Sequence, residues 1–199
     1  MLKIATILPY KENYSEKKAG AVSLWVKDFL MFSKYKNNNV VYGNTSHKPY
    51  LSKNYININI KTLNSKFYSS TNEYLKIIIK ELGKNNFDIV EIHNRPNMIH
   101  ELIEKVNSKY ILYLHNDPRS MKGAKTPKER LNLLLKVDKI IFITKWVKNK
   151  FFEDLVLDTN HYKCEIIYHS IEKERKILKK EKKIVFVGKL NESKGYDIF

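Results

Sequence analysis

Two His-Asn steps follow two neighbouring apolar runs of the sequence, and they are the residues best suited to do chemistry. His93 closes the run "FDIVEIH", and His115 closes "KYILYLH". A neutral imidazole can donate a hydrogen bond to a sugar hydroxyl or to a phosphate oxygen. A single histidine at a strand end is more often structural, but its repetition on two neighbouring runs favours a binding edge. The residues that accompany the two histidines are Asn94, Arg95, Asn116 and Asp117.

Other kinds of site are disfavoured by the spacing of the reactive residues. No third His, Cys or carboxylate stands at ligand spacing from the two histidines, so we expect no metal. The sequence contains no nucleophile elbow, no Walker loop and no zincin helix. The single cysteine, Cys164, lies in the apolar stretch "KCEIIYH", which predicts a packed core thiol.

Small residues open the segment after the first apolar run. Gly20 stands in "AGAV", where the N–H groups at a helix start would be open to a ligand. A phosphate group suits such a position. One glycine without a fuller fingerprint also suits simple close packing, so both interpretations stay open.

Short apolar runs alternate with longer amphipathic stretches along the chain. This alternation predicts an α/β fold, namely a Rossmann-like, mostly parallel sheet with helices on both faces. The expected strands are residues 2–8, 39–43, 55–60, 87–93, 109–115, 139–144 and 164–169. The expected helices are residues 20–34, 71–82, 97–106, 127–137 and 145–155. Because ligands bind beyond the carboxyl ends of parallel strands, His93 and His115 should share one edge.

Two local signals refine this plan. Thr126, Pro127 and Glu129 have the order of an N-cap, a first helical residue and a first-turn acid, so a helix should begin there. The charged stretch "SIEKERKILKKEKK" reads as a solvated connector after the last strand. A domain boundary is expected within such a segment.

The formal charge of +16 raises the question of a nucleic-acid partner. Nearly all of the positive charge is lysine, and the aromatic residues fall inside apolar runs, so a specific nucleic-acid site is disfavoured. A lysine-rich surface suits anionic headgroups better, at about 1 kcal/mol per nearby charge. No apolar run of spanning length and no signal peptide is apparent. We therefore expect a cytoplasmic protein, peripheral at most at a membrane.

The succession of motifs resembles a known family. "ATILPY", "AGAVSLWV", "DIVEIHNRPN", "YILYLHNDP", "VDKIIFITKWVKNKFFE", "EIIYHSIE" and "IVFVGKLNESKG" follow one another as in the nucleotide-sugar-dependent glycosyltransferases of family 4, which have the two-domain GT-B fold. The resemblance implies that residues 1–170 form the N-terminal, acceptor-side domain. It further implies that residues 171–183 form a linker and that residues 184–199 begin a truncated donor-binding domain with its first strand.

The resemblance also implies roles for individual residues. His115 would contact the transferred sugar as the catalytic residue, and the backbone of Gly20 would lie against the donor diphosphate. Lys189 and Lys194 of "GKLNESKG" would grip the same diphosphate. The acceptor cleft would hold His93, Arg95, Asn116 and Asp117. Transfer in this family generally retains the anomeric configuration and needs no metal or other cofactor, the nucleotide sugar being a substrate.

The steps "HNRP" and "LHNDP" and the segment "SMKGAKTPKERLNLLLKVD" look most like bacterial hexosyltransferases of lipopolysaccharide core or related envelope glycans. The expected partners are a nucleotide sugar and a glycan or glycolipid acceptor, met at the inner face of the cytoplasmic membrane. The paired-glutamate motif of the family's second domain is absent, so we expect the isolated chain to be an inactive fragment. The alternatives are a non-catalytic glycolipid-binding module and half of a split enzyme.

Overall fold

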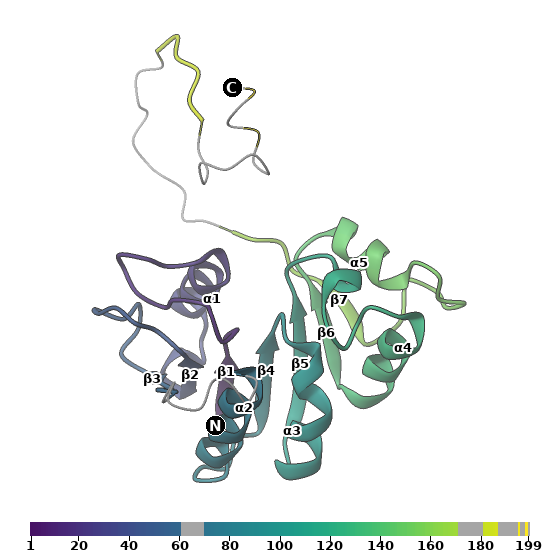
Figure 1. Cartoon of the computed structure of the whole chain (residues 1–199), viewed down its shortest axis with the longest axis horizontal. Helices are drawn as coiled ribbons and strands as arrows, with labels where there is room; N and C mark the ends of the chain where they lie inside the picture. The colour runs from purple at the N-terminus through teal and green to yellow at the C-terminus, as the bar shows by residue number, and fades with distance from the viewer. Residues whose placement is uncertain (61–69, 171–180, 187–194, 196–197, 199) are drawn as a thin grey trace.

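The computed structural model describes residues 1–60, 70–170, 181–186, 195 and 198 (Figure 1). Its centre is a sheet of seven strands in the order β3-β2-β1-β4-β5-β6-β7, and every neighbouring pair is parallel. The strands are β1 Ile4–Ile7, β2 Asn39–Gly43, β3 Tyr55–Asn57, β4 Ile89–His93, β5 Lys109–Leu114, β6 Lys139–Phe142 and β7 Cys164–Ile166. The expected Rossmann-like α/β fold is therefore confirmed.

In the described part of the chain, five α-helices connect the strands, and each lies where the sequence predicts one. They are α1 Ala21–Phe32, α2 Ser70–Leu82, α3 Ile99–Lys105, α4 Pro127–Lys136 and α5 Lys145–Phe152. Short 3-10 turns precede β2 (η1 Lys36–Asn38) and α3 (η3 Pro96–Met98) and follow β5 (η4 Pro118–Ser120). The predicted capping box is present, because the Thr126 hydroxyl accepts from Glu129 N and the Glu129 carboxylate accepts from Thr126 N.

Helices cover the sheet on both faces because its strands are apolar on both sides. On one face α1 packs Val22, Trp25, Val26 and Leu30 against side chains of β2, β5 and β6. On the other face, α2 to α5 bury a larger cluster against the remaining strand residues. Cys164 belongs to this larger core, and burial raises the pKa of its thiol to about 11, which fits the predicted packed thiol.

The switch in strand order positions the site. β1 pairs with β2 on one side and with β4 on the other, so the chain builds the sheet outward in both directions from β1. In open parallel sheets, ligands commonly bind at such a switch point, beyond the carboxyl ends of the strands. The loop after β5 lies beside the loop after β4, since these strands are also neighbours.

The domain boundaries predicted for the end of the chain are not tested by the structure. Residues 171–180 of the predicted linker lie outside the described residues, as do Lys189 and Lys194. Residues 184–186, where a strand is expected, are described without regular secondary structure.

Candidate functional site

His93 and His115 meet at the carboxyl edge of the sheet, as the sequence predicts. Nδ1 of His93 lies 2.9 Å from Nε2 of His115. His93 is the last residue of β4 and is fully buried, stacked on Tyr113 of β5 with ring centroids 4.5 Å apart. Trp25 of α1 contacts both imidazoles, at centroid distances of 5.6 and 5.4 Å. A strand, its neighbour and one helix therefore fix the two rings.

Both imidazoles of this pair are held neutral. Burial lowers the pKa of His93 well below its usual value, and the neighbouring His115 lowers it further. Burial, followed by repulsion from His169, lowers the pKa of His115 to about 4. At neutral pH one ring N–H therefore donates to the bare nitrogen of the other ring. Such a pair offers hydrogen bonds to a ligand rather than a positive charge.

Tyr113 extends the array into the sheet. Its hydroxyl donates to the buried carboxyl of Glu91 at 3.3 Å, and the Thr6 hydroxyl donates to the same carboxyl at 2.7 Å. Burial raises the pKa of Glu91, while these hydrogen bonds oppose the shift. Sequence analysis gave Glu91 no role, because an acid inside an apolar strand carries no motif.

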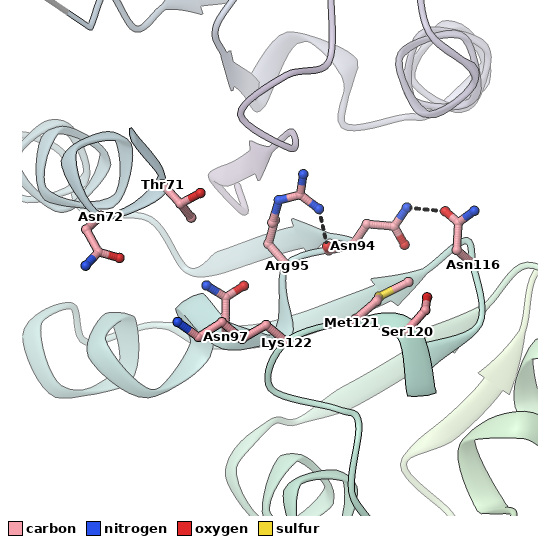
Figure 2. Close-up of a pocket in the computed structure, with 9 residues that line it drawn as sticks. All are labelled: Thr71, Asn72, Asn94, Arg95, Asn97, Asn116, Ser120, Met121 and Lys122. Carbon is pink, nitrogen blue, oxygen red and sulfur yellow. Dashed lines mark hydrogen bonds between the residues drawn. The ribbon is translucent and has the colours of Figure 1, made fainter. Parts of the chain in front are cut away.

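Two asparagines join the loops that follow β4 and β5. Asn94 Nδ2 donates to Asn116 Oδ1 at 2.7 Å (Figure 2). The His115 backbone N–H donates to Asn94 Oδ1, also at 2.7 Å. Asn94 adopts a φ of 52°, a left-handed conformation that asparagine tolerates better than most residues. The Asn94 side chain thus fixes the position of the His115 backbone.

A cavity of about 440 Å³ opens beside these asparagines, within the usual size range of ligand pockets. Arg95 lies in Figure 2 between Thr71 on one side and Asn94 and Asn116 on the other. Of the predicted cleft residues, Arg95 and Asn116 line this cavity, whereas Asp117 does not. The lining residues are Thr71, Asn72, Asn94, Arg95, Asn97, Asn116, Ser120, Met121 and Lys122.

Arg95 is half-buried at the cavity wall. Its Nη1 donates to the Asn94 carbonyl at 2.8 Å, and burial lowers the pKa of its guanidinium. Within the described part of the chain, Arg95 forms no ion pair. It shares the cavity wall with amide and hydroxyl side chains, with Met121 and with Lys122.

Gly123 brings the loop after β5 against the loop after β4. It has a φ of +90°, and a Cβ at this position would lie 2.7 Å from the backbone nitrogen of Asn97. Only glycine permits this approach without strain. Its neighbours Met121 and Lys122 thereby reach the cavity wall.

Asp117 faces away from this cavity into an ion-pair network. Its carboxylate accepts from the Arg119 backbone N–H at 3.0 Å and pairs with the Arg119 guanidinium at 2.8 Å. Arg119 also pairs with Glu153, just past α5, at 2.7 Å. These contacts give Asp117 a structural part in holding η4 against α5.

The N-terminus of α1 already holds an anion from the chain itself. Glu12 Oε1 accepts from the Ser23 backbone N–H at 3.0 Å, and the same carboxylate packs against Gly20 where a side chain would otherwise lie. The predicted open phosphate position at Gly20 is thus capped by Glu12 in this structure. Sequence analysis missed Glu12, because its position depends on the shape of the loop after β1.

Neither a metal-holding cluster nor a membrane-spanning helix is present among the described residues. No group of three or more His, Cys, Asp or Glu among them is arranged to hold a metal ion. In the same part of the chain, no helix is both long and apolar enough to cross a membrane.

Comparison with solved structures shows what the fold is similar to. HepE from Anabaena, in complex with UDP-glucose, matches with a TM-score of 0.56 and 10% identity, over 86% of this chain and 45% of HepE. Sucrose-phosphate synthase from Thermosynechococcus elongatus matches with a TM-score of 0.54 and 12% identity, over 84% of this chain and 48% of the synthase. A shorter form of that synthase matches with a TM-score of 0.53 and 10% identity, over 85% of this chain and 89% of the other.

These likenesses establish the fold, and the chain spans about half the length of the full-length neighbours. No protein-family model matches the sequence, and no curated protein matches it.

Proposed function

We propose that this chain is the acceptor-side domain of a retaining, nucleotide-sugar-dependent glycosyltransferase of the GT-B class, similar to family 4 and of hexosyltransferase type. One observation carries the proposal: a buried, neutral His93–His115 pair lies at the switch point of a sheet that resembles that of HepE, a protein solved with UDP-glucose. Hydrogen-bonding groups without charge suit the hydroxyls of a sugar.

In this proposal His115 contacts the transferred sugar, and His93 holds its ring from behind. The donor diphosphate binds at the N-terminus of α1, beside Gly20, and displaces the Glu12 carboxylate from Ser23 N. Lys189 and Lys194 complete the diphosphate site. Arg95 and Asn116 serve the acceptor from the adjacent cavity.

The proposed acceptor is a lipid-linked envelope glycan of the lipopolysaccharide type. The formal charge of +16 supports a site of action at an anionic membrane surface, the inner face of the cytoplasmic membrane. The enzyme would meet this surface peripherally.

The test is a transfer assay with the protein expressed from its complete reading frame. UDP-, ADP- and GDP-sugars are each supplied with a rough lipopolysaccharide acceptor, and the released nucleoside diphosphate is measured. We expect release with one donor class and a loss of about 100-fold or more in His115→Ala, as is usual when a positioned catalytic group is removed. NMR of the new linkage should show the anomeric configuration of the donor.

His100→Ala is the matched control, because His100 is an exposed histidine on α3 that pairs only with Glu104 within the described residues. It should retain full activity. If His115→Ala transfers as well as the wild type, the catalytic assignment is wrong. If no donor is turned over and the protein binds the glycolipid alone, it is a non-catalytic binding module.

A further inference from the structure

We propose that the cavity beside the histidine pair binds a sugar that carries an anionic group, a phosphate monoester or a carboxylate, with Arg95 as the group that recognises the charge. The proposal rests on the proposed function only in naming this cavity as the acceptor subsite. The binding itself requires no donor and no transfer.

The first argument is the unbalanced charge of Arg95. Its guanidinium is half-buried at the cavity wall and donates one hydrogen bond, to the Asn94 carbonyl. No carboxylate of the described residues pairs with it. Glu12 attracts this guanidinium from beyond ion-pair distance. The half-buried cation therefore lacks a direct anionic partner, and a ligand anion supplies one.

The other described arginines at this end of the fold do not line the cavity, which sets Arg95 apart. Arg119 pairs with Asp117 and Glu153. Arg130 is buried and donates to the carbonyls of Lys125 and Glu153. Among the arginines of the described residues, Arg95 alone lines this cavity.

The second argument is the chemistry of the remaining walls. Asn72, Asn97 and Ser120 supply amides and a hydroxyl, groups that both donate and accept hydrogen bonds. Lys122 adds a second cation from the loop after β5. None of the described residues that line the cavity is acidic. Neutral polar walls with two cations fit a hydroxyl-rich ligand that bears a negative charge.

The third argument is the connection to His115. Asn94 and Asn116 line the cavity (Figure 2), and Asn94 Oδ1 accepts from the His115 backbone N–H. A sugar held in the cavity would therefore lie next to the histidine pair. The anion would anchor this sugar at the far side from His115.

The experiment measures binding of four probes to the chain by isothermal titration calorimetry: glucose 6-phosphate, glucuronate, glucose and inorganic phosphate. We expect one of the two anionic sugars to bind at least about tenfold more tightly than glucose and than inorganic phosphate. Glucose 6-phosphate as the tighter probe identifies a phosphate monoester, and glucuronate identifies a carboxylate. Equal affinity for glucose and for both anionic sugars would overturn the proposal, and so would inorganic phosphate binding as tightly as the sugar phosphate.

Substitutions of Arg95 test whether this residue recognises the anionic group. Arg95→Gln should lower the affinity for the anionic sugar by roughly 10- to 100-fold, which is the usual effect of losing a hydrogen bond to a charged group. Arg95→Lys keeps the charge and should recover part of the affinity, which separates recognition from misfolding. Lys80→Ala, at the opposite end of α2 from Thr71, is the matched control and should bind as the wild type does. Unchanged binding in Arg95→Gln would overturn the assignment.

The result is separable from the proposed function. Tight, Arg95-dependent binding of an anionic sugar together with failed transfer would remove the glycosyltransferase proposal and leave this one. Efficient transfer to an uncharged acceptor, with none of the anionic probes bound, would remove this one alone.

Discussion

Acidification should destabilise this protein through His115, and the size of the loss follows from its burial. The pKa of His115 is lowered to about 4 in the folded state, against an ordinary value of 6.5. The unfolded state therefore takes up the proton first as the pH falls. The contribution of His115 to stability is complete above pH 6.5 and is lost progressively down to about pH 4. At 1.36 kcal/mol per unit, the loss amounts to about 2 kcal/mol at pH 5.

Other buried groups act over the same range and have to be separated from His115. His93, whose pKa is lower still, acts in the same direction. Glu91 acts in the opposite direction, because its raised pKa gives stability below pH 4.5 that is lost as the pH rises. The pH dependence of the wild-type unfolding free energy therefore combines the effects of several groups. The difference in unfolding free energy between the wild type and a His115 variant isolates the effect of His115.

The assay is urea unfolding of the wild type and of His115→Asn at pH 7.5, 6 and 5. Between pH 7.5 and 5, the wild type should lose about 2 kcal/mol more unfolding free energy than His115→Asn does. His100→Asn, on the exposed face of α3, controls for the removal of an imidazole at the surface. A difference that stays constant over this range would refute the reasoning, since the folded protein would then take up the proton as readily as the unfolded chain.

Two further substitutions test the loops around the site. Gly123→Ala places a side chain on a residue with left-handed backbone and against the Asn97 backbone. It should lower the unfolding free energy in urea by about 1 to 3 kcal/mol. Gly83→Ala is the control, because a Cβ there meets no contact under 3.4 Å, and an equal loss in this variant would contradict the strain argument. Glu12→Gln keeps an acceptor for Ser23 N but removes the charge at the start of α1, and should cost about 0.3 to 1 kcal/mol at low salt. Equal stability of this variant and the wild type at low salt would exclude a charge effect.

The regular elements were predictable because each depends on a local pattern. Apolar runs rich in β-branched residues gave all seven strands, and the capping signals at Thr126 fixed the start of α4. The ends were less predictable. The sequence suggests that α5 continues to residue 155, but it ends at Phe152, and Asp154 takes a positive φ of 64°. Side-chain patterns do not encode such a turn.

The candidate site was predictable where topology alone decides it. His93 and His115 meet because neighbouring parallel strands end at one edge, whatever the loops do. The position of Glu12 depends on a loop that folds back over eleven residues. The Arg119 guanidinium that pairs with Asp117 is also held by Glu153, far along the chain. Contacts of this kind follow from three-dimensional packing and leave no local trace in the sequence.

The central place of β1 in the sheet has a consequence for the synthesis of the chain. One edge of β1 pairs with β2, which follows soon after it in the sequence. The other edge pairs with β4, so Ile4 cannot pair with Ile89 until β4 has been synthesised. During translation the first strand thus carries an unpaired, apolar edge until the ribosome has released β4. Such an edge is a template for pairing with another chain. The nascent protein is for this reason more prone to aggregate than the folded one, in which β1 is an interior strand of the sheet.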